Sequence, residues 1–325
     1  MKQVVILASE RCLLSTVAGP MDMFLQAGVL WNGLLGKEPS PFFEVKVVTI
    51  DGNNVTSNNQ MPIVPNCAAT EVEQADLVLI PSQGYQFDPH SEDYLARVDW
   101  LKNCYEKGAD LASICTGAFP LASTGLLDGK TATTHWGVAK QFKAAFPAVE
   151  LRTDLMVTDE DRLFCGGGLT ADLNLSLYLI NKYCGREIAL QSSRCTLVDL
   201  DRVSQLPFSV FSPERDHNDH EILNAQDWIG LHFRENINLD ALAEKSGMSL
   251  RNFNRRFKAA TGETAVKYMQ LTRIESVKFE LENTRRPFEE IAVEVGYENV
   301  SFLRRIFKSN TGLSPTVYRK KFSLS

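Results

Sequence analysis

A cysteine at the end of an apolar segment is the first residue whose surroundings suggest chemistry. Asp110 to Ile114 is typical of a buried strand, Cys115 follows it directly, and small residues lead from there into a helical segment. A thiol at such a strand-to-helix corner is expected to stand exposed at a helix N-terminus, where the helix dipole lowers its pKa. The position predicts a nucleophile or a ligand-contacting thiol, with an inert residue filling the corner as the third interpretation.

A histidine after a second short run of strand-forming residues could serve such a thiol as a base. His135 ends a threonine-rich run, and a Cys–His pair is a common arrangement for nucleophilic catalysis. It could equally be a structural histidine that caps the next helix. Gly84 suits either a loop whose backbone amides face the corner or a plain turn. We expect one ligand pocket, formed at the carboxyl ends of the strands and lined by Cys115, Thr116, His135 and Gly84.

Two further patterns do not indicate a cofactor or metal site. Gly166-Gly167-Gly168 lacks the spacing of a dinucleotide-binding fingerprint, and tight packing of a strand against a helix explains it better. His217 and His220 stand in a polar stretch that offers no fixed groups to orient metal ligands. The sequence therefore predicts no metal and no cofactor.

The last third of the chain contains an internal repeat with an offset of 49 to 50 residues. Leu242 to Met248 matches Ile291 to Tyr297, and each copy carries a glycine suited to a left-handed turn. Each copy is followed by a second helical segment, Ser249 to Ala259 or Asn299 to Lys308, with basic residues on one face and apolar residues on the other. The repeat predicts two helix-turn-helix units in tandem.

The second helix of each unit has the side chains that DNA recognition requires. A helix in the major groove reads bases through bidentate polar side chains and holds phosphates through cations. For one helix alone, a solvated basic face is the alternative interpretation, but the arrangement occurs twice. The predicted DNA contacts are Arg251, Asn254, Arg255 and Lys258 in the first unit, and Ser301, Arg304, Arg305 and Lys308 in the second.

The elements that must position these residues differ along the chain. Residues 1 to about 190 alternate β-branched runs with amphipathic segments, which predicts an α/β doubly wound, flavodoxin-like domain. A polar stretch with two prolines and no sustained period follows. We assign residues 1–195 to the α/β domain, 196–220 to a linker and 221–325 to an all-α domain. The expected strands are Val4 to Ala8, Phe43 to Ile50, Leu77 to Ile80, Asp110 to Ile114 and Leu163 to Cys165.

Charge separates the same two parts. Residues 1–220 hold 17 Lys and Arg against 27 Asp and Glu, whereas residues 221–325 hold 17 against 13, so an overall pI near 5.5 hides a basic module. The ordinary composition, without an apolar run of membrane-spanning length, argues against disorder and transmembrane helices. Seven cysteines without a C-x-x-C pair fit neither a disulfide framework nor a zinc site, and predict a reducing, cytoplasmic location.

The end of the second unit reads Gly312-Leu313-Ser314-Pro315-Thr316-Val317-Tyr318-Arg319. This stretch, with the repeat, resembles the AraC/XylS-type DNA-binding domain over residues 221–325. The resemblance implies a long helix, here about Ala265 to Glu282, that joins the units and sets their recognition helices one DNA turn apart. It also places the base-reading positions on the Arg, Asn and Ser residues named above. The first unit lacks the usual Ser-Pro, which leaves the start of the joining helix open.

Three segments of the α/β part carry a second resemblance: Ile114 to Phe119, Ala132 to Trp136 and Ala18 to Phe24. They are similar to the PfpI/ThiJ group of the class I glutamine amidotransferase-like superfamily, and above all to its GlxA-type regulators, which carry an AraC-type domain. In the superfamily's enzymes an acidic residue touches the cysteine and a histidine commonly follows it. Ser15 and Thr116 fall at these positions here, so the resemblance implies a domain without catalytic helpers and adds Ser15 to the predicted ligand residues.

The expected protein is a ligand-responsive transcriptional regulator and not an enzyme. Its partners are duplex DNA, contacted at two adjacent major grooves on one face, and a small effector, for which the resemblance implies a nitrogen-containing metabolite. RNA polymerase and a second copy bound through the α/β domain stay open as partners, and no membrane partner is expected. The alternative is a bifunctional cysteine-dependent hydrolase or amidase with a regulatory DNA-binding tail.

Overall fold

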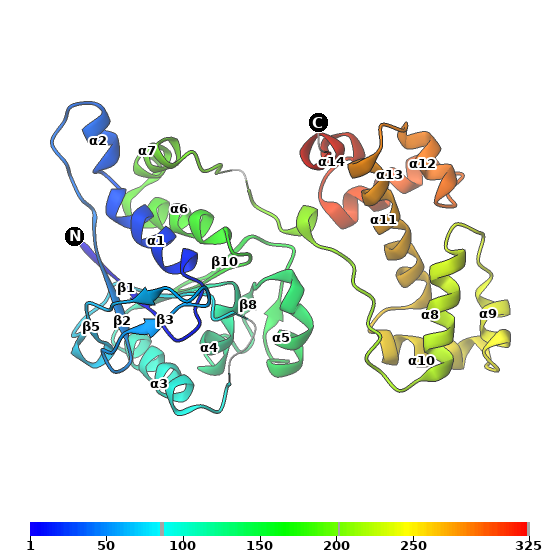
Figure 1. The fold of residues 1–325 in the computed structure, drawn as a ribbon, viewed down its shortest axis with the longest axis horizontal. Coiled ribbons are helices and arrows are strands. Elements are labelled where there is room, and N and C mark those ends of the chain that lie inside the picture. The colour runs from blue at the N-terminus through cyan, green and yellow to red at the C-terminus, as the bar shows by residue number, and fades with distance from the viewer. Residues whose placement is uncertain (85–87, 201, 324–325) are drawn as a thin grey trace. The chain divides into compact units, whose positions relative to one another are not determined.

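The chain divides into two compact units, residues 1–205 and 206–325 (Figure 1). The computed structural model describes residues 1–84, 88–200 and 202–323. Each unit buries its own apolar clusters. The division falls inside the segment 196–220 that the sequence assigns to a linker.

Unit one is built on a seven-stranded sheet in the order β10-β11-β7-β6-β1-β2-β5. The strands run parallel except at one edge, where β10 pairs antiparallel with β11. The sheet strands are β1 (Lys2–Leu7), β2 (Phe43–Thr49), β5 (Cys67–Ala68), β6 (Leu77–Ile80), β7 (Asp110–Ile114), β10 (Val157–Glu160) and β11 (Leu163–Gly166). Two short pairs are separate: β3 (Val55–Thr56) with β4 (Pro62–Ile63), and β8 (Thr131–Ala132) with β9 (Glu150–Leu151). The predicted α/β doubly wound fold and its five expected strands are confirmed.

Helices cover both faces of this sheet because successive strand residues point to opposite sides. Val4 and Ile6 of β1 belong to one buried cluster, and Val5 and Leu7 to the other. The first cluster packs under α1 (Ser15–Gln26), α6 (Ala171–Cys184) and α7 (Arg186–Thr196), with α2 (Leu30–Leu34) against α7. The second packs under α3 (Glu92–Glu106), α4 (Ala118–Ser123) and α5 (Ala139–Ala145).

The turn after β7 packs directly onto the end of β6. Cys115–Gly117 form a 3₁₀ turn that leads into α4. A Cβ atom on Gly117 would lie 2.2 Å from the carbonyl oxygen of Ile80 and 2.8 Å from that of Pro81. Only glycine therefore allows the turn to approach the neighbouring strand so closely.

Unit two contains seven α-helices among its described residues. They are α8 (His220–His232), α9 (Leu239–Lys245), α10 (Leu250–Thr261), α11 (Ala265–Asn283), α12 (Phe288–Glu294), α13 (Val300–Thr311) and α14 (Pro315–Phe322). The joining helix implied by the AraC-type resemblance is α11, and its open start is resolved: Thr264 accepts a hydrogen bond from the Lys267 amide, as Ser314 does from Val317 at α14.

The two helix-turn-helix units repeat the same side-chain packing. Thr261 donates to the carbonyl of Phe257, whose ring meets that of Tyr268 edge to face at 5.3 Å. In the second unit Thr311, Phe307 and Tyr318 make the same contacts, with the rings at 5.2 Å. The internal sequence repeat is therefore a structural repeat.

We predict that Gly117→Ala destabilises unit one by about 2 kcal/mol or more, because the added methyl group must displace strand backbone. Gly33→Ala is the matched control, since its Cβ would meet no described atom within 4 Å and alanine favours a helix. Urea unfolding of both variants measures the difference. Equal midpoints for Gly117→Ala and the wild type would contradict the tight approach.

Candidate functional site

The predicted DNA-contacting residues lie on two equivalent helices, α10 and α13. Ser249 caps α10 by accepting from the Asn252 amide, and Asn299 caps α13 by accepting from Phe302. The apolar faces pack inward through Phe253, Phe257, Leu303 and Phe307, all buried. Of the eight predicted contacts, Asn254 is half-buried and the other seven are exposed: Arg251, Arg255, Lys258, Ser301, Arg304, Arg305 and Lys308. Both helices therefore present a basic polar face to solvent.

Neighbouring side chains hold three of these arginines. Arg304 pairs with Glu289 of α12, and its guanidinium lies 5.4 Å from the Phe288 ring centroid. Arg305 lies over the Phe302 ring at 5.3 Å. Arg255 donates to Asn252 at 2.9 Å. The Arg304–Glu289 pair is more than half exposed, so it contributes little stability and can open when a phosphate or base competes.

The orientation of the two helix-turn-helix units is set by Arg273, in the middle of α11. Its guanidinium donates to the carbonyls of Phe233 and Glu235, which follow α8, at 2.6 and 2.7 Å, and to that of Gly296 at 3.3 Å. The Gly296 turn belongs to the second unit, and a Cβ there would lie 2.4 Å from the Arg234 carbonyl oxygen. The end of α8 is thus fixed against the turn of the second unit.

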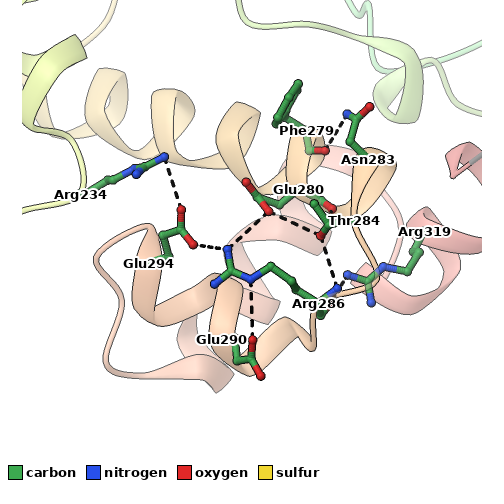
Figure 2. Close-up of polar contacts among 9 residues, drawn as sticks. All are labelled: Arg234, Phe279, Glu280, Asn283, Thr284, Arg286, Glu290, Glu294 and Arg319. Carbon is green, nitrogen blue, oxygen red and sulfur yellow. Dashed lines mark hydrogen bonds and ion pairs between the residues drawn. The ribbon is translucent and has the colours of Figure 1, made fainter.

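A second arginine, Arg286, organises the start of that unit (Figure 2). It pairs with Glu280 at the end of α11 and with Glu290 and Glu294 of α12. Glu294 holds the pKa of Arg286 above its ordinary value and has its own pKa lowered in return. The Arg286 carbonyl accepts from Arg319 of α14. These contacts join α11, α12 and α14, and the sequence motifs gave no sign of them.

In unit one, Cys115 occupies the predicted corner in a strained conformation. Its φ of 56° is unusual for a residue other than glycine, and only 2% of its surface is exposed. Burial raises the pKa of the thiol, although the Ser82 hydroxyl and the Thr116 amide act in the opposite direction. The expectation of an exposed thiol with a lowered pKa was wrong, because desolvation outweighs the helix terminus.

Hydroxyl groups surround this corner and bond to one another. Thr116 Oγ1 lies 2.9 Å from Ser82 Oγ and accepts from the Gln83 amide at 2.9 Å. The Ser82 amide donates to Thr16 Oγ1 at 3.1 Å. We call Thr16, Ser82, Gln83, Cys115 and Thr116 the elbow cluster. The sequence analysis did not single out Thr16, Ser82 or Gln83, although Ser82 and Gln83 come just after the predicted strand Leu77 to Ile80.

The other predicted ligand residues have different surroundings. Ser15 is the exposed first residue of α1, whereas its buried neighbour Thr16 bonds within the elbow cluster by accepting from the Ser82 amide. His135 Nδ1 accepts from the Gly137 amide at 3.0 Å, and burial lowers its pKa, so the imidazole stays neutral. Gly84 has a φ of 69° and faces the Arg11 carbonyl and Asn58. His135 thus caps a turn, as its structural alternative had it, and Gly84 has the left-handed backbone that glycine favours.

The connection to unit two is anchored beside the elbow cluster by Gln205, the last residue of unit one. Its side chain is 2% exposed and donates through Nε2 to Thr133 Oγ1, the Thr134 carbonyl and the Leu155 carbonyl, at 3.0 to 3.1 Å. Thr134 Oγ1 in turn donates to the Cys115 carbonyl at 2.7 Å. A Cβ on Gly167 would lie 2.0 Å from Gln205 Nε2. The glycine run therefore leaves room for this amide, in addition to the predicted strand-to-helix packing, which Gly166 makes against Leu175.

A buried carboxyl group lies near the same end of the sheet. Asp172, in the first turn of α6, is 4% exposed, and desolvation raises its pKa from 3.8 to about 7 despite the Leu173 amide and the Arg202 charge. A Cβ on Gly19 would lie 2.7 Å from Asp172 Oδ2. Gly19 of the predicted Ala18 to Phe24 motif therefore makes room for this carboxyl group, which the sequence analysis did not single out.

The chain belongs to the DJ-1/PfpI family, whose model matches residues 9–181, and residues 242–321 match a helix-turn-helix domain model. Among curated relatives, the HTH-type transcriptional regulator CdhR of Pseudomonas aeruginosa is 25% identical over 83% of this chain and 80% of its own length. GlxA of Rhizobium meliloti, also named an HTH-type transcriptional regulator, is 24% identical over 86% of each chain. These matches agree with both resemblances seen in the sequence.

Matches to unit one alone include an enzyme. The isonitrile hydratase of Pseudomonas putida is 28% identical over 54% of this chain and 72% of its own length. The crystal structure of an AraC family transcriptional regulator from Pseudomonas putida has a TM-score of 0.52 at 18% identity, over 60% of this chain and all of that one. That likeness concerns the fold. Within the described residues, no helix is long and apolar enough to cross a membrane.

The buried carboxyl group predicts a pH dependence of stability. Because the folded state holds the Asp172 proton more tightly than the unfolded chain, the free energy of unfolding falls as pH rises from about 4 to about 7. The asparagine of Asp172→Asn does not titrate. The free energy of unfolding of this variant should therefore rise relative to that of the wild type across this pH window, by at most about 4 kcal/mol. Chemical denaturation at pH 5 and pH 8 measures it, and a constant difference between the two proteins would contradict the raised pKa.

The glycine run offers a matched pair of variants. Gly167→Ala should expel the Gln205 side chain, whereas Gly168→Ala should not, since its Cβ would lie 3.8 Å from His135 Cδ2. Hydrogen exchange by mass spectrometry should show faster exchange at residues 202–206 in Gly167→Ala alone. Equal exchange in the two variants would show that Gln205 does not anchor this segment.

Proposed function

We propose that this protein is a ligand-responsive transcriptional regulator acting in the cytoplasm. The observation that carries the proposal is the duplicated helix-turn-helix, with two capped helices that expose the same pattern of basic residues. The joining helix α11 has 19 residues, about 28 Å of helix, which is close to the 34 Å of one DNA turn. This supports simultaneous contact with two adjacent major grooves on one face of the duplex.

The proposed division of labour follows side-chain chemistry. Arg251, Asn254 and Arg255, and Ser301, Arg304 and Arg305, would contact base edges, since bidentate and short polar groups distinguish base pairs. Lys258 and Lys308 lie in the last turn of their helices and would contact phosphates as point charges. Relatives named as HTH-type transcriptional regulators over most of the chain support this reading.

Unit one is proposed to bind the effector, a small nitrogen-containing metabolite, at the carboxyl ends of the sheet strands. Cys115 and Thr116 of the elbow cluster are the central contacts, with Ser15, Gly84 and His135 on the surrounding loops. Gln205 would transmit the effect of ligand binding to the connecting segment, because its amide bonds to Thr134 and Thr134 bonds to Cys115. RNA polymerase and a second copy of unit one are proposed as further partners.

A cysteine-dependent enzyme is the second candidate, favoured by the match to an isonitrile hydratase. Two observations weigh against it. The thiol of Cys115 is buried with a raised pKa, and a thiolate, not a thiol, is the nucleophile. The described hydrogen bonds of the elbow cluster come from hydroxyls and backbone groups, which provide no base. We therefore propose that unit one binds without turnover.

The DNA-binding test compares arginine with lysine. Arg251→Ala and Arg305→Ala should each relax discrimination at particular base pairs by about 1 to 3 kcal/mol. Lys258→Ala and Lys308→Ala should weaken binding to all sequences alike and reduce its salt dependence. Selection of operators from a random duplex library, followed by titration at two salt concentrations, measures both effects. Uniform losses for all four variants would mean that the base contacts are assigned wrongly.

The enzyme question is tested with Cys115→Ser, which keeps a hydrogen-bonding atom of similar size. The variant should fold, bind DNA as the wild type does and keep its regulation. The wild type should show no thiol-dependent turnover of isonitriles, amides or esters. A rate in the wild type that disappears in Cys115→Ser would establish the enzyme instead.

A further inference from the structure

A concave site lies on unit one, away from the elbow cluster. It has a volume of about 680 Å³ and is lined by α6, by α7, by the edge strand β10 and by the connecting residues Asp199, Leu200, Arg202 and Val203. Sites for small molecules have volumes of this order. One wall of the groove therefore belongs to the segment that leads from unit one to unit two.

The floor of the groove is apolar, and its exposed lining mixes apolar residues such as Leu200 and Val203 with polar ones. Met156, Leu177 and Ala189 lie at the floor with 1 to 2% of their surfaces exposed. Two polar residues also line the groove: Asn181, which is exposed, and Ser193, which is half-buried. An apolar surface with a few polar groups at its margin is the usual construction of a small-molecule site.

The charges of the groove favour an anion. Among the described residues that line it, Arg186, the exposed first residue of α7, and Arg202 of the connecting segment carry positive charge, and Asp199 carries negative charge. A cation at a helix N-terminus is disfavoured by the helix dipole, so helix stability does not account for Arg186. Arg202 donates to Thr170 and faces Asp172. Because the pKa of Asp172 is about 7, that carboxyl group only partly offsets the Arg202 charge near neutral pH.

We propose that this groove binds a small carboxylate with an apolar body, and that the bound molecule holds the connecting segment against unit one. The carboxylate would meet Arg186 and Arg202, because guanidinium groups match carboxylate geometry. The apolar body would cover Leu177 and Ala189. This site goes beyond the proposed function, since it requires neither the elbow cluster nor a nitrogen-containing effector.

Hydrogen bonds to its backbone hold the wall that the ligand would touch. Asn174 donates to the Asp199 carbonyl at 2.9 Å, and the Met156 amide donates to the Val203 carbonyl at 3.0 Å. A molecule that contacts α6, α7 and this segment together adds to those contacts. Such a molecule binds more tightly when the connecting segment lies in place, so its binding favours the ordered arrangement of that segment.

The test uses the full-length chain, with hexanoate as the probe and its uncharged isostere hexanamide as the control ligand. Calorimetric titration should show hexanoate binding at least tenfold more tightly than hexanamide. Arg186→Gln should weaken hexanoate at least tenfold, and Arg186→Lys should weaken it less. Both variants should melt at the wild-type temperature, because Arg186 is exposed. Cys115→Ser should bind hexanoate unchanged, which separates the groove from the elbow cluster.

Hydrogen exchange supplies the second measurement. Saturating hexanoate should slow exchange in the peptide that spans residues 199–203 in the wild type, and not in Arg186→Gln. Equal affinity for acid and amide, no binding of either, or hexanoate binding that survives Arg186→Gln would overturn the site. Binding without protection of residues 199–203 would overturn the link to the connecting segment. None of these results depends on DNA binding, so the proposed function is tested separately.

Discussion

The geometry of unit two depends on the guanidinium of Arg273, which donates to two backbone carbonyls after α8 and to one in the turn of the second helix-turn-helix unit. A joining helix fixes the distance between two recognition helices but leaves their rotation to packing at its ends. Arg273 sits in the middle of α11 and connects the end of α8 with the Gly296 turn, so it constrains that rotation. Since two linked modules gain affinity only when both can engage at once, this constraint decides whether α10 and α13 can reach successive grooves together.

In unit one the deciding quantity is desolvation. Cys115 keeps the strained backbone of a nucleophile corner, with a φ of 56°, and the chain belongs to a family whose matches include an enzyme. Burial nevertheless raises the pKa of the thiol and outweighs the Ser82 hydroxyl and the Thr116 amide, which lower it. The fold has thus kept the corner with polar neighbours that do not offset the desolvation of a thiolate.

The sequence predicted what depends on local pattern and missed what depends on distant contacts. Alternating β-branched runs located the main strands, and the internal repeat located both helix-turn-helix units. At the start of α1 the sequence pointed to Ser15, whereas Thr16 is the residue that bonds to the Ser82 amide, because adjacent residues of a helix point about 100° apart. Gln205 meets Thr134 across 71 residues, and Arg273 meets Phe233 across 40. No spacing rule connects such pairs, and the pKa of Cys115 depends on burial that only the folded chain defines.

The segment that leads to unit two contacts unit one near the elbow cluster and at the groove. A buried polar side chain is costly unless its hydrogen bonds are made. Gln205 meets that condition at Nε2, which has three acceptors within 3.1 Å where Gly167 leaves space, while its Oε1 is buried with no partner among the described residues. A few residues earlier, Asp199 and Val203 form the wall of the groove beside α6 and α7. The segment is therefore attached to the rest of unit one both next to the elbow cluster and beside the groove. Any ligand that alters either attachment changes the freedom of the chain that leads to the DNA-binding unit, without a change in the recognition helices themselves.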